Sequence, residues 1–258
     1  MGPRRRCYAE SLGDCDGGPL ELEHFVPAAL QALLGRTEPS GFAWRRPGHL
    51  AAPGSYAASR MLCKKHHDLL DRLDAPLVQY VRNFMVIMLG KTLSDSGPPA
   101  SRNDIRDVDG HLLERSLLKF ACGALASRSL SAPLGIAQGA EIDYHAAKEE
   151  LVRPLFGASP WPTEWLLHVE QRNVRIVGGP PVQLGFDLRW DDQGHLQGVE
   201  MVTFLFHSVL VLRPEQFVTG SNVLRQPKRL CVASSLPDGR HPLPGVTPGE
   251  HLCFNLSW

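Results

Sequence analysis

Four side chains that commonly bind metal ions are divided between two distant parts of the N-terminal region. Cys7 and Cys15 stand near the start of the chain, whereas Cys63 and His66 stand much later. Each pair alone is a weak signal, but together they supply the four sulfur and imidazole ligands of a tetrahedral structural zinc site. If they bind one ion, the segment that contains Cys63 and His66 must lie beside the segment that contains Cys7 and Cys15. The metal then closes the long loop between them, which lacks an obvious core.

The composition is that of a folded protein. The chain has 258 residues, of which 27 are Lys or Arg, 27 are Asp or Glu, and 43% are hydrophobic. This length allows one large or two modest domains, and the charge balance excludes a disordered or strongly charged tail. The apolar runs are far shorter than the roughly 20 residues of a membrane span, and no secretory segment is recognisable. We therefore expect a soluble, cytoplasmic protein without a membrane partner, whose six cysteines need not form disulfides.

Turn-forming residues separate two parts of the chain. Residues 90–104 are rich in Gly, Pro and Ser and show neither helical nor alternating periodicity. We expect a linker at 93–104, between an N-terminal module at 1–92 and a second domain at 105–258. The connection at 35–60 is also rich in Pro and Gly, and it is more typical of a functional loop than of regular structure.

Hydrophobic periodicity predicts an α+β fold. In the first module we expect a hairpin within Cys7–Glu23, a helix over Pro27–Leu34, and helices that begin at Lys64 and Asp74. In the second domain we expect two helices and then a mostly antiparallel sheet. The helices expected there follow Gly110 and span Tyr144–Val152, and the strands are Trp165–Val169, Val174–Val177, Val182–Trp190 and Val199–Leu212.

Two short motifs stand out in the N-terminal region. The first is Glu23-His24 within Leu22–Pro27, and the second is Cys63-Lys64-Lys65-His66-His67. Together they resemble the HNH, or ββα-metal, endonuclease family. The continuation Leu69–Asp74 is similar to a subgroup of that family. The resemblance covers roughly residues 5–75, and it implies that the N-terminal module is a zinc-stabilised ββα-metal fold.

The resemblance also implies a role for each matching residue. His24 would be the general base, and Glu23 and His67 would bind a catalytic Mg²⁺, Mn²⁺ or Ni²⁺ ion. The structural zinc would be bound by Cys7, Cys15, Cys63 and His66. The implied reaction is hydrolysis of DNA, expected to be double-stranded, with 5′-phosphate and 3′-hydroxyl products, and analogy suggests restriction or defence. A neutral imidazole can accept a proton from water near neutral pH, and a divalent ion can neutralise the phosphoryl group.

The sequence departs from the family at three positions. Glu23 replaces the more usual Asp, and His67 replaces an Asn, which favours Mn²⁺, Ni²⁺ or Zn²⁺ over Mg²⁺. Ala58-Ser59-Arg60 occupies the place of the Asn that orients the base. Adjacent strand residues also point to opposite faces, so Glu23 and His24 need a bulge or the strand end to reach one site. The alternative is therefore a non-catalytic zinc module that binds nucleic acid or a protein.

Basic side chains near the motifs are weak candidates for nucleic-acid contacts. Basic residues outnumber acidic ones between 36 and 72. Arg45 and Arg46, in the long connection, and Lys64 and Lys65, at the helix start, could contact phosphates. The second domain shows no catalytic motif, and its sheet could serve recognition or assembly, including a homodimer.

Two other sets of metal-binding side chains carry weaker signals. Cys231 and Cys253 lie near His241 and His251 but lack the close spacing of a metal motif. His207 lies in an apolar run and is more typical of a hydrogen-bonded core histidine than of a ligand. We therefore expect no functional centre at these positions.

Overall fold

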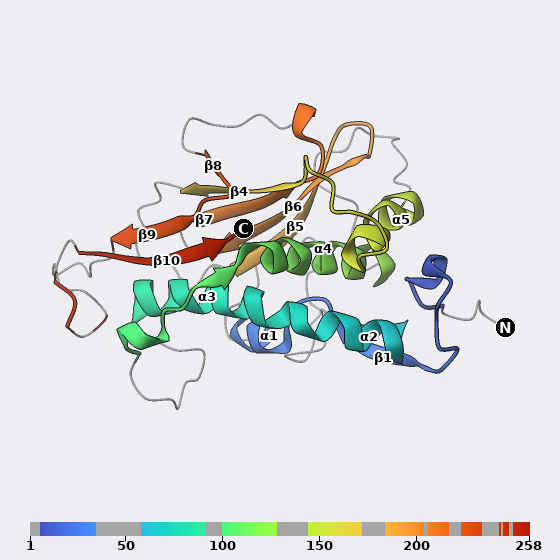
Figure 1. The fold of residues 1–258 in the computed structure, drawn as a ribbon, viewed down its shortest axis with the longest axis horizontal. Helices are drawn as coiled ribbons and strands as arrows, with labels where there is room; N and C mark the ends of the chain where they lie inside the picture. The colour runs from blue at the N-terminus through green and yellow to red at the C-terminus, as the bar shows by residue number, and fades with distance from the viewer. Residues whose placement is uncertain are drawn as a thin grey trace, which may run out of the picture.

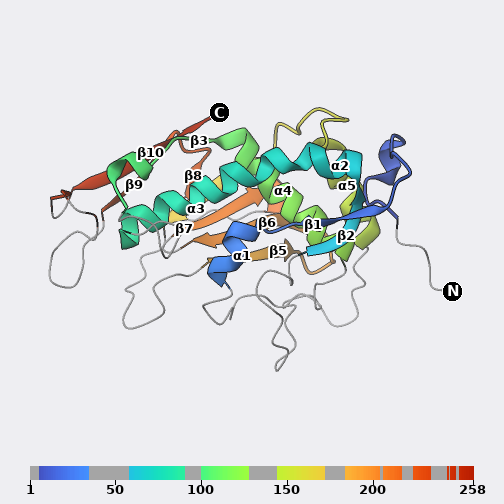
Figure 2. The ribbon, with the colours of Figure 1, turned by 90° about the horizontal axis from the view of Figure 1, so that it is seen from below.

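The computed structural model has an α+β architecture in which helices pack on one side of an antiparallel sheet (Figures 1 and 2). The residues that it describes are 6–34, 58–90, 100–127, 144–171, 184–203, 206–216, 223–233, 243, 245–247 and 250–258. The α-helices are α1 (Ala28–Leu34), α2 (Lys64–Leu70), α3 (Asp74–Leu89), α4 (Gly110–Ser127) and α5 (Tyr144–Leu155). The described part of the chain contains no helix that is long and apolar enough to cross a membrane.

The strands form three sheets. A two-stranded antiparallel sheet pairs β1 with β2, a three-stranded sheet has the order β3-β10-β9, and a five-stranded antiparallel sheet has the order β5-β6-β7-β4-β8. Only β3 and β10 are parallel partners among the described strands. The strands are β1 (Leu20–His24), β2 (Ala58–Cys63), β3 (Val108–Asp109), β4 (Leu166–Gln171), β5 (Leu184–Trp190), β6 (Leu196–Thr203), β7 (Phe206–Val211), β8 (Val223–Arg225), β9 (Arg229–Ala233) and β10 (His251–Ser257).

The expected helices are confirmed, and so are most of the expected strands. The predicted strand at Val199–Leu212 is instead two antiparallel strands, β6 and β7. The predicted strand at Val174–Val177 lies outside the described residues.

The predicted hairpin within Cys7–Glu23 is wrong, because β1 pairs with β2 across the long connection. The segment before β1 instead forms a short 3₁₀ helix, Glu10–Leu12, which ends at Gly13 with a φ of 79°. Gly17 also has a positive φ, of 70°, which only glycine adopts readily. The turn signal at Asp16 was therefore real, but it belongs to a loop and not to a hairpin.

Helix α4 lies at the centre of the molecule (Figure 2). Most of its side chains are buried, which is the pattern of a helix surrounded by protein. On one side Phe120 contacts Phe25, which follows β1, with ring centroids 6.2 Å apart. On another side the ring centroid of Phe120 lies 5.1 Å from that of Phe186 in β5. Helix α4 therefore packs between the residues that follow β1 and the five-stranded sheet.

Helix α3 also packs on the five-stranded sheet. The ring centroids of Phe84 and of Phe206 in β7 are 4.5 Å apart. The hydroxyl groups of Tyr80 and Ser208 are 2.8 Å apart. The buried apolar residues on both sides of the predicted linker form one continuous cluster. The division at 93–104 stays a prediction, since residues 91–99 lie outside the described part of the chain.

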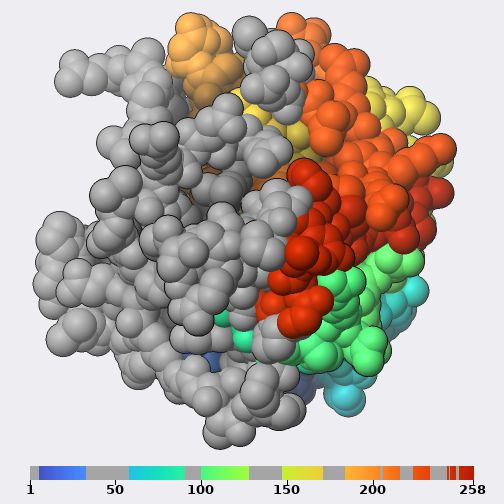
Figure 3. All heavy atoms as spheres, turned by 90° about the vertical axis from the view of Figure 1, so that its left-hand side faces the viewer, coloured from blue at the N-terminus to red at the C-terminus, as the bar shows by residue number. Residues whose placement is uncertain are grey.

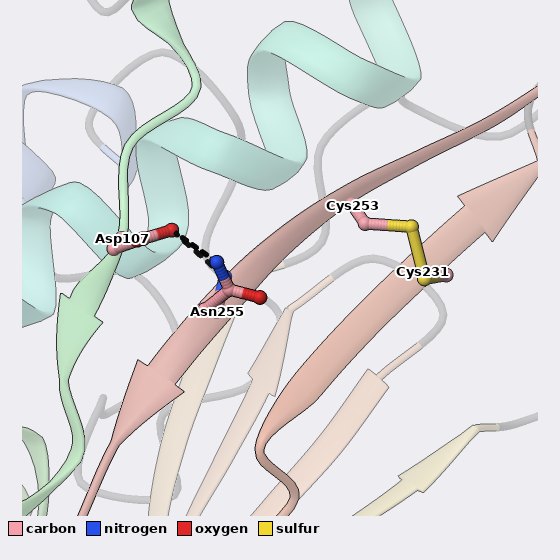
Figure 4. The surroundings of a disulfide bond; sticks show 4 residues. All are labelled: Asp107, Cys231, Cys253 and Asn255. Atoms are coloured by element: carbon pink, nitrogen blue, oxygen red, sulfur yellow. Dashed lines mark hydrogen bonds between the residues drawn. A yellow bond between two sulfur atoms is a disulfide. The ribbon is translucent and has the colours of Figure 1, made fainter.

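Cys231 and Cys253 form a disulfide between β9 and β10, where they are directly opposite one another (Figure 4). The side chain of Asn255 in β10 donates a hydrogen bond to Asp107, just before β3, at 3.0 Å. β10 therefore connects β9 with the segment that leads into α4, and it lies on the surface beside that segment (Figure 3). Neither cysteine is available to a metal in this pairing. Such bonds are rare in the cytosol, so the disulfide gives no support to a cytoplasmic location.

We expect Gly123→Ala to destabilise the protein by about 1–3 kcal/mol, the usual cost of overpacking a core. A Cβ atom at Gly123 would lie 2.2 Å from the Cβ of buried Phe25, so helix α4 or the chain after β1 must shift. Urea unfolding measures the change. Gly185→Ala is the matched control, because a Cβ there has no heavy atom within 4 Å. Equal stability of the two variants would contradict this packing.

We expect reduction of Cys231–Cys253 to lower the free energy of unfolding by about 3 kcal/mol, because the bond closes a segment with a sequence separation of 22. Urea unfolding with and without a phosphine reductant, which binds zinc poorly, measures the effect. The variant with Cys231→Ser and Cys253→Ser should be insensitive to the reductant. A wild-type protein that is equally insensitive would argue against the bond.

Candidate metal centres

Three cysteines and one histidine converge at the N-terminal end of α2. The sulfur atoms of Cys7, Cys15 and Cys63 lie 3.5, 3.7 and 3.2 Å from Nδ1 of His66. All four ligand atoms lie within 4.8 Å of one another. In a tetrahedral zinc site, bond lengths of about 2.3 Å to sulfur and 2.0 Å to nitrogen separate these atoms by about 3.6 Å. The cluster could therefore hold a metal ion and is compatible with structural zinc.

Backbone contacts bring the two cysteine-bearing segments together. The amide of Tyr8 donates to the carbonyl of Met61 in β2 at 2.9 Å, so Cys7 lies beside the strand that ends at Cys63. The carboxylate of Asp16 accepts a hydrogen bond of 3.0 Å from the backbone amide of Lys65, in the first turn of α2. Acidic groups stabilise helix N-termini by accepting such free amides.

The ring of His66 is fixed from its other side. Its Nε2 lies 2.9 Å from a carboxylate oxygen of Asp14, and its ring contacts the edge of Phe156 with centroids 5.0 Å apart. The side chain is fully buried. A carboxylate on the far nitrogen of a histidine sets the tautomer so that the near nitrogen can bind a metal. Asp14 therefore orients Nδ1 of His66 toward the three sulfur atoms.

The metal-free thiols are neutral at pH 7. Burial raises the pKa of Cys7, and it raises the pKa of Cys15 to about 12. Metal binding requires thiolates, so a bound ion would have to displace the thiol protons. The donor set is one that zinc prefers.

A second group of side chains surrounds His67, the next residue of α2. Oε2 of Glu23 and Nε2 of His67 are 3.5 Å apart. Two ligands of one divalent ion, each about 2.1 Å from it, are separated by about 3.0–3.4 Å. Nδ1 of His67 lies 3.6 Å from Asp68 and 3.7 Å from Asp71. The structure therefore brings together Glu23 and His67 as the sequence predicts, and it adds two carboxylates on the outer side of the imidazole.

Glu23 is almost completely buried and forms an ion pair with Lys119 of α4. Nζ of Lys119 lies 2.7 Å from Oε1 of Glu23 and donates a hydrogen bond to Asp74 at 2.6 Å. Burial raises the pKa of Glu23, and the charges of Lys119 and His67 oppose this shift. Lys119 is 3% exposed, so its charge acts in a region with little water.

His24 is the last residue of β1 and is half-buried. The strand contains an irregularity between Glu21 and Leu22, which lies before Glu23 and His24 and leaves these two in alternation. The exposure of the two side chains agrees with this alternation, because Glu23 is 1% exposed whereas His24 is half-buried. The residue opposite His24 in β2 is Ala58, whose side chain cannot form a hydrogen bond. Any convergence of His24 with Glu23 must therefore come from the strand end and not from the bulge.

The predicted nucleic-acid contacts are only partly described. Arg45 and Arg46 lie outside the described residues. Lys64 forms an ion pair with Asp68 at 2.8 Å, and Lys65 forms one with Asp14. Both lysines are exposed, so these pairs contribute little to stability and can open toward a phosphate.

Two charged residues of these centres were not anticipated from the motifs. Lys119 stands alone within an apolar helical stretch, and such a charge indicates a buried partner. Asp14 lies beside the predicted ligand Cys15, and a carboxylate is a common partner of the far nitrogen of a metal-binding histidine. His207 is a core histidine as expected, with Nε2 3.0 Å from Glu200.

Comparison with known proteins identifies no relative. No sequence model of a known family matches the chain, and no curated protein or solved structure matches it. The assignment of the two centres therefore depends on the contacts described above.

We expect Cys63→Ser to remove one equivalent of bound zinc and to lower the thermal unfolding temperature. Cys63 contributes the sulfur atom nearest to Nδ1 of His66, and it joins β2 to α2. Metal analysis of the purified protein and thermal unfolding measure both effects. Cys122→Ser is the control, since Cys122 is buried in α4 and is not part of the cluster. Full zinc content in Cys63→Ser would contradict the site.

Proposed function

We propose that the protein is a metal-dependent HNH-type endonuclease that hydrolyses phosphodiester bonds of double-stranded DNA. The observation that carries the proposal is the approach of Glu23 to His67, at 3.5 Å. His24 follows Glu23 in the sequence, as the last residue of β1. The chain order is β1, α1, β2, α2, so the paired strands β1 and β2 and the helix α2 could supply the ββα arrangement that the resemblance implies, with α1 inserted between the strands. The cluster at Cys63 and His66 joins the same strand and helix, and its proposed ion is structural zinc.

Each residue has a defined task in the proposed reaction. His24 accepts a proton from the water that attacks phosphorus, which is the role of a neutral imidazole near pH 7. Glu23 and His67 would hold the divalent ion, since their ligand atoms lie 3.5 Å apart. When bound, the ion supplies charge neutralisation at the phosphodiester. The resemblance implies that the products carry a 5′-phosphate and a 3′-hydroxyl.

The alternative is a zinc-binding interaction module on the same scaffold, which binds nucleic acid or protein without cleavage. Two observations favour it. Ala58 lies opposite His24, where a side-chain hydrogen bond to the base is absent in the described residues. The carboxylate of Glu23 is already neutralised by Lys119. Against it stands the orientation of His67, whose Nε2 faces Glu23 without belonging to the cysteine cluster.

We expect the zinc-loaded protein to nick supercoiled plasmid in the presence of Mn²⁺, Ni²⁺ or Mg²⁺, and His24→Ala to reduce the rate by about 10²–10⁴-fold. Gel electrophoresis measures the nicked fraction, with EDTA as the metal-free control. His251→Ala is the matched variant, because His251 is an exposed residue of β10 far along the chain from the motifs.

The same experiment separates the two proposals. Cleavage that is lost in His24→Ala and kept in His251→Ala supports the nuclease. A folded, zinc-loaded wild-type protein that binds DNA but cleaves it with none of the three metals would favour the interaction module.

A further inference from the structure

Lys119 is a buried cation at the proposed metal centre, and no motif in the sequence includes it. It belongs to α4, whereas Glu23 belongs to β1 and Asp74 begins α3. Its Nζ lies 2.7 Å from Glu23 and 2.6 Å from Asp74. Three elements that are distant in sequence therefore meet at one ammonium group.

This arrangement differs from an ordinary surface ion pair. Lys119 is 3% exposed and Glu23 is 1% exposed. Removing two charges from water is costly, and a buried pair is by itself weak evidence for a gain in stability. A packed pair of apolar side chains would often serve the core equally well. The position of Lys119 therefore points to a task at Glu23.

The ion pair divides the two oxygens of the Glu23 carboxylate. Oε1 faces Lys119, and Oε2 faces Nε2 of His67 at 3.5 Å. The contact at Oε1 is an ion pair without hydrogen-bond geometry, and it leaves Oε2 directed toward His67. His67 is arranged in the same way, because its Nδ1 faces Asp68 and Asp71 while its Nε2 faces Glu23. The ammonium group of Lys119 thus lies behind Glu23, and two carboxylates lie behind the imidazole of His67.

We propose that Lys119 is a positioning residue for the metal, which fixes Oε2 of Glu23 toward Nε2 of His67 so that both bind one divalent cation. The inference rests on the proposed function, since it assigns a task within that same site. Lys119 does not contact the substrate, because its ammonium group is enclosed by Glu23 and Asp74.

The test compares Mn²⁺ binding in zinc-loaded variants by electron paramagnetic resonance. The variant is Lys119→Met combined with Asp74→Asn, which avoids leaving two carboxylates without their shared cation. Asp74→Asn alone is the matched control, because it retains the ion pair between Lys119 and Glu23. Glu23→Gln identifies the Mn²⁺ that is bound at this site. Zinc content and near-ultraviolet circular dichroism verify the fold.

We expect the double variant to bind Mn²⁺ about 10–100-fold more weakly than Asp74→Asn, the usual effect of losing a residue that orients a metal ligand. If the double variant does not fold, Lys119→Ala with Asp74→Asn replaces it, since water can enter the space that it leaves. We expect this variant to show the same difference in Mn²⁺ affinity from Asp74→Asn.

Two results would overturn the inference, and they are distinguishable. If the folded variant and Asp74→Asn bind Mn²⁺ equally while the wild type cleaves DNA, Lys119 has no positioning role and the proposed function stands. If the wild type binds no Mn²⁺ that Glu23→Gln removes, both proposals fail together.

Discussion

The direction of two consecutive side chains on α2 determines how the rest of the site is built. Successive residues of an α-helix point about 100° apart. His66 therefore faces the three cysteine sulfurs, while His67 faces Glu23 of β1. One helical turn therefore faces two groups of side chains, thiols on one side and a carboxylate on the other. The pairing of β1 with β2 meets both demands, since β2 leads directly into α2.

The local part of this arrangement could be predicted from the sequence. Ligand type and order indicate the cluster of Cys7, Cys15, Cys63 and His66, which the structure confirms as a group able to hold a metal ion. Helix starts at Lys64 and Asp74 were also correct, because apolar spacing and turn chemistry act over a few residues. The proposed catalytic roles of His24 and Glu23 are a different matter, and they stay predictions.

The non-local part could not be predicted in the same way. The partner of β1 is a strand that follows a long connection, and alternation within β1 does not identify it. The contact between Lys119 and Glu23 joins residues on either side of the predicted linker, so no motif could reveal it. The pairing of Cys231 with Cys253 likewise depends on the register of β9 and β10, which spacing alone does not provide.

The way in which β1 and β2 meet has a consequence for how this protein can vary. The start of β2 at Ala58 pairs with His24 at the end of β1, so strand pairing holds together the two ends of the segment that joins these strands. The entropy of closing such a connection grows slowly, by about 0.6 kcal/mol for each doubling of its length. Insertions and deletions there are therefore inexpensive, and this is the position at which the protein could gain a new binding loop, or accept an inserted domain, without rebuilding either centre.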